Sequence, residues 1–234
     1  MNYIKLFSLA VLILISSCGQ KENTSNTMAE KTRTYLALGD SYTIGEGVAE
    51  SGRYPNQAIS ILKEKGKVFE TPTLIAKTGW TTDELKKGIE VAEIESNTYD
   101  LVTLLIGVNN QYRGREIENY REEFGELLRK AIGFAKGNAN HVVVISIPDW
   151  GITPFADERN TDKAKVAGEI DLYNAANQTI AKTLGVHYIE ITERYREIGA
   201  KEEMVVADKL HPSHLVYEEW AQELAKIIEG KMQL

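Results

Sequence analysis

The sequence predicts an α/β fold, a three-layer α/β/α sandwich whose middle layer is a five-stranded parallel sheet. Short runs rich in β-branched and other apolar residues alternate with longer segments whose apolar residues recur at helical spacing. Alternating strands and helices form βαβ units, which give a parallel sheet with helices on both faces. The number of units is too small for a closed eight-stranded barrel, so we expect an open sheet.

Five segments have the composition of buried strands. Each is short and mostly apolar, and each is followed by a glycine, a proline or a charged residue. They are residues 34–38, 73–76, 101–106, 141–147 and 186–189. Continuous apolar runs are typical of strands that are buried on both faces of a parallel sheet. We expect them to pair in the flavodoxin-like order.

Helical segments separate these strands. Their apolar residues recur three and four positions apart, as on the buried face of a helix. Pro55 opens the first helix, which runs to residue 65, and Thr81 or Thr82 caps the second, which continues past Asp83. Three longer helices are predicted at residues 118–136, 163–184 and 212–228.

The amino terminus has the pattern of a targeting segment. Lys5 supplies a positive charge, residues 6–15 form a short apolar run, and Ser16 and Ser17 precede Cys18. The run is too short to favour a transmembrane helix. Small residues before a cysteine, directly after such a run, resemble the signal of bacterial lipoproteins, which is cut before a cysteine that carries lipid.

This resemblance divides the chain into three parts. Residues 1–17 would be a signal peptide, Cys18 the lipidation site, and residues 18–32, which are polar and aperiodic, a flexible tether. Residues 33–234 would form the folded domain, held by lipid at a membrane of the bacterial cell envelope. An ordinary secretory signal with an unmodified cysteine is the alternative. Cys18 is the only cysteine, so no intramolecular disulfide can form.

Composition and charge limit the class of partner. Of the 234 residues, 43% are hydrophobic and 26% are charged, which suits one soluble domain with a sizeable core. The formal net charge is −7, and no basic stripe occurs along the sequence. Nucleic acid is therefore excluded as the main partner, whereas this charge places no restriction on a neutral substrate.

Ser41, Asp208 and His211 are the residue types of a serine hydrolase. A serine hydroxyl becomes a nucleophile when a histidine takes its proton, and a neighbouring carboxylate fixes the tautomer of that histidine. Asp208 lies three residues before His211, so the acid and the base can share one short turn. The sequence therefore predicts acyl transfer through a covalent intermediate, with these three as catalytic residues.

Four polar motifs lie where the predicted strands end or the last helix begins. They are Gly39-Asp40-Ser41, Gly79-Trp80-Thr81-Thr82, Gly107-Val108-Asn109-Asn110 and Asp208-Lys209-Leu210-His211. In an open parallel sheet, the functional site lies beyond the carboxyl ends of the strands. In this order and on this scaffold, the four motifs resemble those of the GDSL/SGNH hydrolases, and the resemblance covers residues 33–230.

The resemblance implies an oxyanion hole and a class of reaction. The family's oxyanion donors correspond here to the backbone N–H groups of Ser41 and Gly79 and the side-chain amide of Asn109. The family comprises esterases, lipases, thioesterases and carbohydrate deacetylases, and it needs no metal and no organic cofactor. We therefore expect a serine esterase acting on acetyl or short-chain esters of carbohydrate or lipid. Asn110 departs from the family pattern Gly-x-Asn-Asp, which has an aspartate at this position.

Other functions and residues remain as alternatives. A lysophospholipase or thioesterase is a related activity, and a non-catalytic surface binding module is possible on the same fold. A flavodoxin-type nucleotide binder is disfavoured because no Gly-x-Gly-x-x-Gly motif follows the first strand. His214 is a second candidate base, but only His211 fits the pattern Asp-x-x-His-Pro. The sequence leaves the oligomeric state open.

Several aromatic residues and histidines have both a structural and a functional interpretation. Tyr42, Trp80, Tyr112 and Trp150 lie in the expected site loops, where they could contact a sugar ring or an acyl chain. Packing beneath the loops is the default for each of them. Two further histidines flank or lie within predicted strands and are expected to be structural: His141 and His187.

Overall fold

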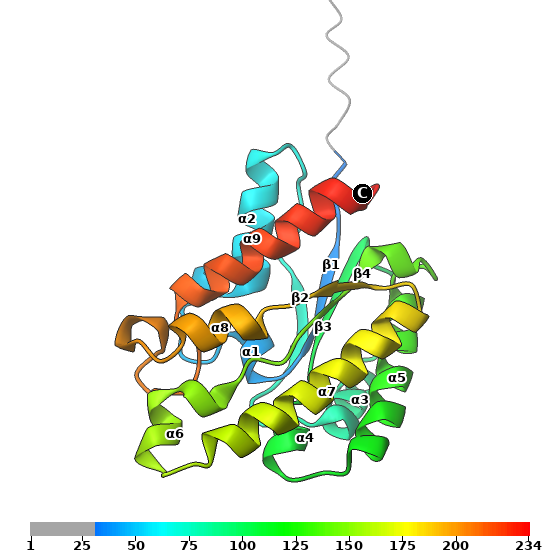
Figure 1. Cartoon of the computed structure of the whole chain (residues 1–234). Coiled ribbons are helices and arrows are strands. Elements are labelled where there is room, and N and C mark those ends of the chain that lie inside the picture. The colour runs from blue at the N-terminus through cyan, green and yellow to red at the C-terminus, as the bar shows by residue number, and fades with distance from the viewer. Residues whose placement is uncertain (1–30) are drawn as a thin grey trace, which may run out of the picture. The chain divides into compact units, whose positions relative to one another are not determined.

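A parallel sheet runs through the part of the chain that the structure describes, residues 31–234 of a computed structural model (Figure 1). Its strand order is β2-β1-β3-β4-β5, which is the flavodoxin-like order. From β1 to β5 the strands span Tyr35–Gly39, Thr73–Ala76, Leu101–Leu105, Val142–Ile145 and His187–Ile189. The five predicted strands and the predicted fold class are confirmed.

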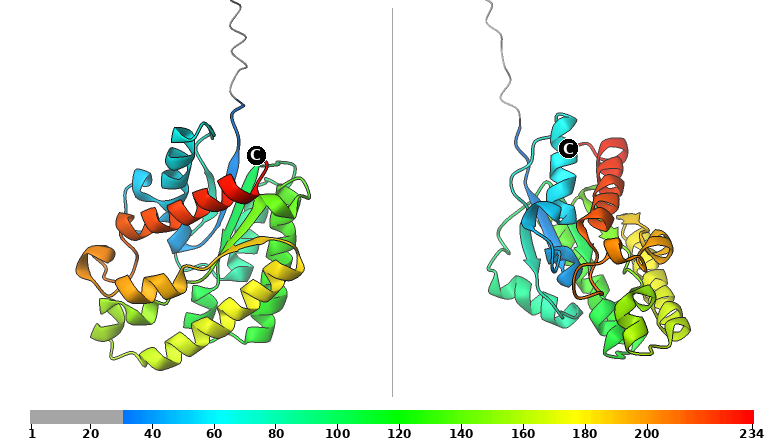
Figure 2. Two further views of the ribbon diagram at one scale, coloured as in Figure 1. Left: turned by 45° about the horizontal axis from the view of Figure 1, so that its top comes forward. Right: turned by 90° about the vertical axis from the view of Figure 1, so that its left-hand side faces the viewer.

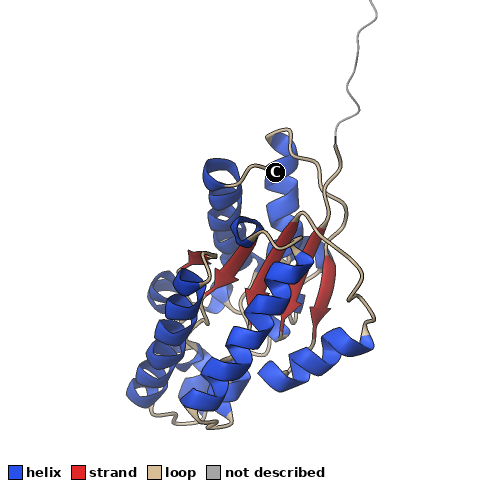
Figure 3. Cartoon of the chain, turned by 90° about the vertical axis from the view of Figure 1, so that its right-hand side faces the viewer, coloured by secondary structure: helices blue, strands red, loops and turns tan. Residues whose placement is uncertain are grey.

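Helices cover both faces of this sheet. On one face, α2 (Tyr54–Glu64) packs against α9 (His214–Lys231). On the other, α5 (Ile117–Phe134) packs between α3 (Thr82–Val91) and α7 (Lys163–Thr183) (Figure 2). The connection from β1 to β2 runs toward one edge of the sheet, whereas the later connections run toward the other edge. Since such crossovers are right-handed, α2 lies on one face, and α3, α5 and α7 lie on the other. Figure 3 shows the strands pointing the same way between the helices.

The sequence periodicity does not predict the short helices. These are α1 (Ser41–Ile44), α4 (Val108–Tyr112), α6 (Pro154–Glu158) and α8 (Thr192–Ile198), together with 3₁₀ turns at Glu50–Gly52, Ala139–His141, Trp150–Ile152 and Glu202–Met204. Each is too short to show a periodic apolar pattern. Two of them carry predicted site residues, since α1 begins at Ser41 and α4 contains Asn109.

Some predicted boundaries are wrong by one to three residues. The last helix begins at His214 because Ser213 is the N-cap and has extended backbone angles. The strand predicted at 141–147 is shorter at both ends, and His141 belongs to the preceding 3₁₀ turn. The cap of α3 is Thr81, whose side chain forms a reciprocal capping box with Glu84.

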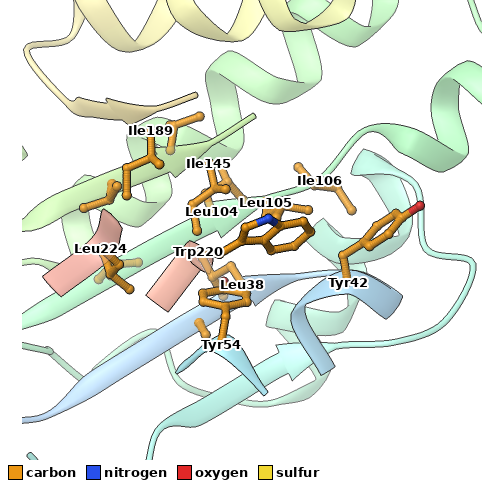
Figure 4. Packing of buried hydrophobic residues seen from close by; sticks show 14 of the residues in the cluster. Leu38, Tyr42, Tyr54, Leu104, Leu105, Ile106, Ile145, Ile189, Trp220 and Leu224 are labelled. Carbon is orange, nitrogen blue, oxygen red and sulfur yellow. The ribbon is translucent and has the colours of Figure 1, made fainter. Parts of the chain in front are cut away.

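The core between the sheet and α9 is built around Trp220 (Figure 4). Its ring lies 5.1 to 6.3 Å, between centroids, from the rings of four tyrosines: Tyr42, Tyr54, Tyr195 and Tyr217. These side chains come from α1, α2, α8 and α9, so one aromatic cluster joins four helices. Such contacts stabilise by about 0.5–1.5 kcal/mol each beyond the burial of area. Because Tyr42 belongs to this cluster, the cluster supports the segment that begins at Ser41.

The amino-terminal predictions lie outside the described residues. They concern the signal peptide at residues 1–17, Cys18, and the tether up to residue 30. Within residues 31–234, no helix has the length and apolar character that crossing a membrane requires.

Candidate active site

One cavity at the carboxyl ends of the strands brings three predicted site residues together. Ser41 begins α1 directly after β1, Asn109 lies in α4 after β3, and His211 lies in the turn before α9. All three line a cavity of about 200 Å³. The other lining residues are largely apolar: Tyr42, Val108, Tyr112, Trp150, Phe155 and Leu210. The fold thus unites segments 170 residues apart in the sequence (211 − 41).

Among residues 31–234, no backbone acceptor pairs with the N–H group of Ser41. Asp40 is the N-cap of α1, and its Oδ1 accepts a hydrogen bond from the N–H of Tyr42 at 3.0 Å. Ser41 is the first residue of the helix, so its own N–H has no partner in the preceding turn. Gly39 permits this sharp exit from β1, since a Cβ there would lie 2.3 Å from the carbonyl oxygen of Leu105.

Asp208 and His211 form a direct pair. The distance from Asp208 Oδ2 to His211 Nδ1 is 2.6 Å, while Asp208 Oδ1 accepts from the backbone N–H groups of Leu210 and His211 at 2.8 and 2.9 Å. Burial alone would raise the pKa of Asp208, but these hydrogen bonds outweigh burial and hold the pKa below its usual range. The carboxylate is therefore ionised and orients the imidazole.

The turn that carries this pair is held in place on both sides. Lys209 has a φ of 63°, which is unusual for a residue with a side chain, and its carbonyl accepts from the N–H of Phe155 at 3.0 Å. The ring of His211 lies 5.5 Å from that of Tyr42, between centroids. Within residues 31–234, no hydrogen bond joins Ser41 Oγ to His211. In enzymes without substrate, this contact is commonly long and tightens on binding.

Gly79, the other predicted oxyanion donor, follows β2 and is not among the residues that line the cavity. It has a φ of 85° in the turn closed by the hydrogen bond from Trp80 N–H to Lys77 O at 3.2 Å, a conformation that favours glycine. Within the described part of the chain, the N–H of Gly79 donates to no acceptor. A Cβ at this position would meet only Arg113, at 3.7 Å, so conformation rather than space explains the glycine.

The two asparagines of α4 have different partners. Asn109 Nδ2 donates one hydrogen to the carbonyl of Trp80 at 3.0 Å, which leaves its second hydrogen available at the cavity. Asn110 is fully buried and bonds to Thr82 twice, accepting from its N–H at 3.1 Å and donating to its hydroxyl at 2.7 Å. Asn110 therefore connects α4 to α3 and does not line the cavity.

The candidate aromatic residues divide between cavity and packing. Tyr42, Tyr112 and Trp150 line the cavity, whereas Trp80 packs against α3, where a Cβ on Gly88 would lie 2.1 Å from its ring. The sequence did not indicate Phe155 as a lining residue. Its only signal is an aromatic residue in a loop near a strand end, which is common in buried loops.

The other histidines lie away from this cavity. His214 is exposed at the start of α9 and borders a different depression, beside Gln57. His187 is in β5 and contacts Asn140, and burial lowers its pKa and that of His141. Among residues 31–234, no cluster of three or more acidic, histidine or cysteine side chains could hold a metal ion.

Comparison with known families identifies the class of protein. A family model described as the GDSL-like Lipase/Acylhydrolase family matches residues 37–219. The match spans most of the chain, and the chain therefore belongs to this family. It is a hydrolase that acts on ester bonds. The resemblance predicted from the four motifs is confirmed. A search of curated protein sequences finds no match.

Solved structures of other proteins share the fold. A lipase/acylhydrolase from Enterococcus faecalis superposes with a TM-score of 0.65 at 18% identity, covering 86% of this chain and 100% of that one. The structure of TesA superposes with a TM-score of 0.64 at 16% identity, covering 86% of this chain and 100% of that one. A catalytic mutant of an acetylxylan esterase from Geobacillus stearothermophilus superposes with a TM-score of 0.64 at 16% identity, covering 84% of this chain and 94% of that one.

Proposed function

We propose that this hydrolase is a serine esterase that transfers a short acyl group from an oxygen ester to Ser41 and then to water. The observation that carries the proposal is the single cavity lined by Ser41, Asn109 and His211, with His211 paired to Asp208 at 2.6 Å. These groups suffice for acyl transfer without a metal.

The two half-reactions use the same residues. His211 Nε2 takes the proton of Ser41 Oγ as that oxygen attacks the ester carbonyl, and it returns the proton to the leaving alcohol. Water then attacks the acyl-enzyme, again assisted by His211. Asp208 holds the proton on Nδ1 and stabilises the imidazolium that forms in both steps.

Three donors would bind the oxyanion. The unpartnered N–H groups of Ser41 and Gly79 and the second amide hydrogen of Asn109 would meet the negative charge of the tetrahedral intermediate. Removing one such donor typically lowers kcat by about 10²–10³-fold, equivalent to about 3–4 kcal/mol.

The cavity favours an acetyl or other short acyl group. Its volume of about 200 Å³ lies below the ~300–1,000 Å³ of pockets that enclose drug-sized ligands. Trp150 is buried on one wall, and its Nε1 donates to Gln111 at 2.8 Å, which fixes the indole. A fixed indole limits the length of the acyl chain. This argues against lysophospholipids as the preferred substrate.

An acetylated carbohydrate is the substrate that we favour. Tyr112 is 58% exposed and packs edge-on against Trp150 at 5.3 Å between centroids. An exposed aromatic ring at the rim of the cavity suits contact with a sugar ring. One of the structurally similar proteins is an acetylxylan esterase, which supports this choice.

The direct test of catalysis is ester hydrolysis by purified protein. Residues 33–234 should hydrolyse p-nitrophenyl acetate, and Ser41→Ala should lower kcat by at least about 10³-fold because no nucleophile remains. His214→Ala is the control, since this histidine lies outside the cavity, and it should keep activity within about 2-fold. Equal activity of Ser41→Ala and the wild type would refute the assignment. An inactive wild type would favour a binding module.

The acyl group and the carbohydrate part of the proposed substrate are tested separately. Trp150→Leu should raise the ratio of octanoyl to acetyl hydrolysis by at least about 10-fold, because it lengthens the acyl pocket. Tyr112→Ala should reduce activity on acetylated xylan more than on p-nitrophenyl acetate. An unchanged chain-length profile in Trp150→Leu would contradict the acyl assignment.

We also propose that the domain is anchored by lipid on Cys18, at a membrane of the bacterial cell envelope. The proposal is supported by the apolar run and the small residues before Cys18. Mass spectrometry of the mature protein tests it. An unmodified Cys18 in the mature protein would refute it.

A further inference from the structure

A side chain of α4 and the side chain of its C-cap hold successive carbonyl groups of the Gly79 turn. Asn109 Nδ2 donates to the carbonyl of Trp80 at 3.0 Å, and Arg113 Nη2 donates to the carbonyl of Gly79 at 2.6 Å. Asn109 and Arg113 are four residues apart, so they project from the same side of this helix and its cap. Both carbonyls are thereby engaged by α4 and its C-cap residue.

The rest of the turn is also held by side chains. The N–H of Thr81 donates to Glu84 Oε2 at 2.9 Å, and that of Thr82 donates to Asn110 Oδ1 at 3.1 Å. Across residues 79–82, the backbone group left without an acceptor in the described part of the chain is therefore the N–H of Gly79. This is the group that the proposed function assigns to the oxyanion hole.

We propose that Arg113 is a positioning residue of the oxyanion hole, which it aligns by fixing the carbonyl of Gly79. The inference rests on the proposed function. Glycine rotates more freely about its backbone bonds than any other residue, and Gly79 has a φ of 85°. The N–H of Gly79 lies in the preceding peptide unit and is joined to the carbonyl through the φ and ψ rotations of Gly79. The bond from Arg113 anchors the carbonyl side of this linkage and so limits how far the N–H can turn before substrate arrives.

Arg113 is itself oriented by a second contact. Its Nη1 donates to Glu84 Oε2 at 3.2 Å, the same oxygen that caps α3. One guanidinium thus joins the turn, α3 and α4, a geometry suited to the planar fork of arginine. The Arg113 side chain is 43% exposed, and exposed ion pairs contribute little to stability. Its removal should therefore affect catalysis more than folding.

The test compares two arginines that both contact the start of α3. Arg113→Met removes the donor to Gly79 and keeps most of the aliphatic stem. Arg115→Met is the matched control, because Arg115 pairs with Asp83 at 2.8 Å and makes no bond to the turn. Hydrolysis of p-nitrophenyl acetate, which is neutral, gives kcat and KM. Affinity for a trifluoromethyl ketone, which forms an oxyanion adduct with a serine, is measured in parallel.

Arg113→Met should lower kcat by about 10–100-fold, because misplacing a donor costs less than or as much as deleting it. The KM and the melting temperature of Arg113→Met should stay near those of the wild type. Its affinity for the ketone should fall in proportion to kcat. Arg115→Met should match the wild type in all of these measurements. Arg113→Lys, which keeps one donor, should recover part of the loss. It also provides the test if Arg113→Met does not fold.

Three results would overturn the positioning role. They are an unchanged kcat in folded Arg113 variants, a change confined to KM, or an equal loss in Arg115→Met. In each of these cases an active wild type and an inactive Ser41→Ala leave the proposed function intact. An inactive wild type would instead reject the proposed function on which the inference rests.

Discussion

At the scale of single residues, Asp40 is a carboxyl group placed beneath the candidate nucleophile. It is fully buried, and its Oδ2 has no hydrogen-bond partner within residues 31–234. Burial raises the pKa of Asp40 to about 7, although the hydrogen bond from the N–H of Tyr42 acts in the opposite direction. The neighbouring titratable groups are tyrosines whose own pKa values burial raises: Tyr42, Tyr54, Tyr120 and Tyr217.

This raised pKa predicts how stability depends on pH. Folded Asp40 keeps its proton up to about pH 7, whereas the unfolded chain releases it near the ordinary value of 3.8. The contribution of Asp40 is therefore complete below that ordinary value and is lost as the pH rises to about 7. Asp40→Asn removes the titration while preserving an acceptor for the N–H of Tyr42.

The free energy of unfolding of Asp40→Asn, relative to the wild type, should rise by roughly 3 kcal/mol between pH 5 and pH 8. Urea denaturation of both proteins at the two pH values measures it. The comparison uses the change with pH, so a constant offset from the substitution does not affect it. Parallel stability profiles would show that Asp40 is already ionised in the folded protein.

The site residues differ in how far the sequence reveals them. Ser41 and the pair Asp208 and His211 are indicated by their chemistry and spacing, and the fold brings Ser41 and His211 to one cavity. Arg113 carries no such signal, because most arginines after a short helix are solvated. Its contact with the Gly79 carbonyl depends on the packing of α4 against the turn, which no local pattern encodes.

At the scale of elements, α4 combines a site residue with the contacts that hold its neighbours. Asn109 faces the cavity, while Asn110 points to Thr82, whose hydroxyl donates to Glu123 on α5. The family's aspartate could make two of these bonds as an acceptor, from the N–H and from the hydroxyl of Thr82. Asn110 instead donates to that hydroxyl, which directs the hydroxyl hydrogen to Glu123.

Asn110→Asp should therefore leave kcat within about 5-fold of the wild type, since the substitution rearranges a contact outside the cavity. The adjacent Asn109→Asp is the control, because it removes an amide donor and should lower kcat by about 10²–10³-fold. Steady-state hydrolysis of p-nitrophenyl acetate gives the kcat of each variant for this comparison. A larger loss in Asn110→Asp than in Asn109→Asp would contradict the division of roles within α4.

Long elements are predictable from the sequence and short ones are not. The helices α5 and α7 span 18 and 21 residues, enough for the apolar spacing to define them within two residues at each end. By contrast, α1 and α4 have four and five residues and are set by their caps and by tertiary contacts. The site is built largely on these short helices, so its geometry required the structure.

At the scale of the whole molecule, the strand order places the site. Since β1 and β3 are neighbours in the sheet, the segments after them approach each other beyond their carboxyl ends. The aromatic cluster around Trp220 joins α9 to α1, and the ring of Tyr42 in that cluster also contacts His211. The sequence predicts a parallel sheet of flavodoxin-like order, but it does not predict this cluster, whose members are scattered over residues 42–220.

The most direct measurement of the central claim is the site of covalent labelling by a fluorophosphonate. The reagent reacts with a serine whose hydroxyl is activated by a histidine, so it reports the nucleophile without assuming a natural substrate. We expect one adduct per molecule, mapped by peptide mass spectrometry to Ser41, and none in Ser41→Ala or His211→Ala. Labelling at another serine, or no labelling of an intact, folded protein, would contradict the account.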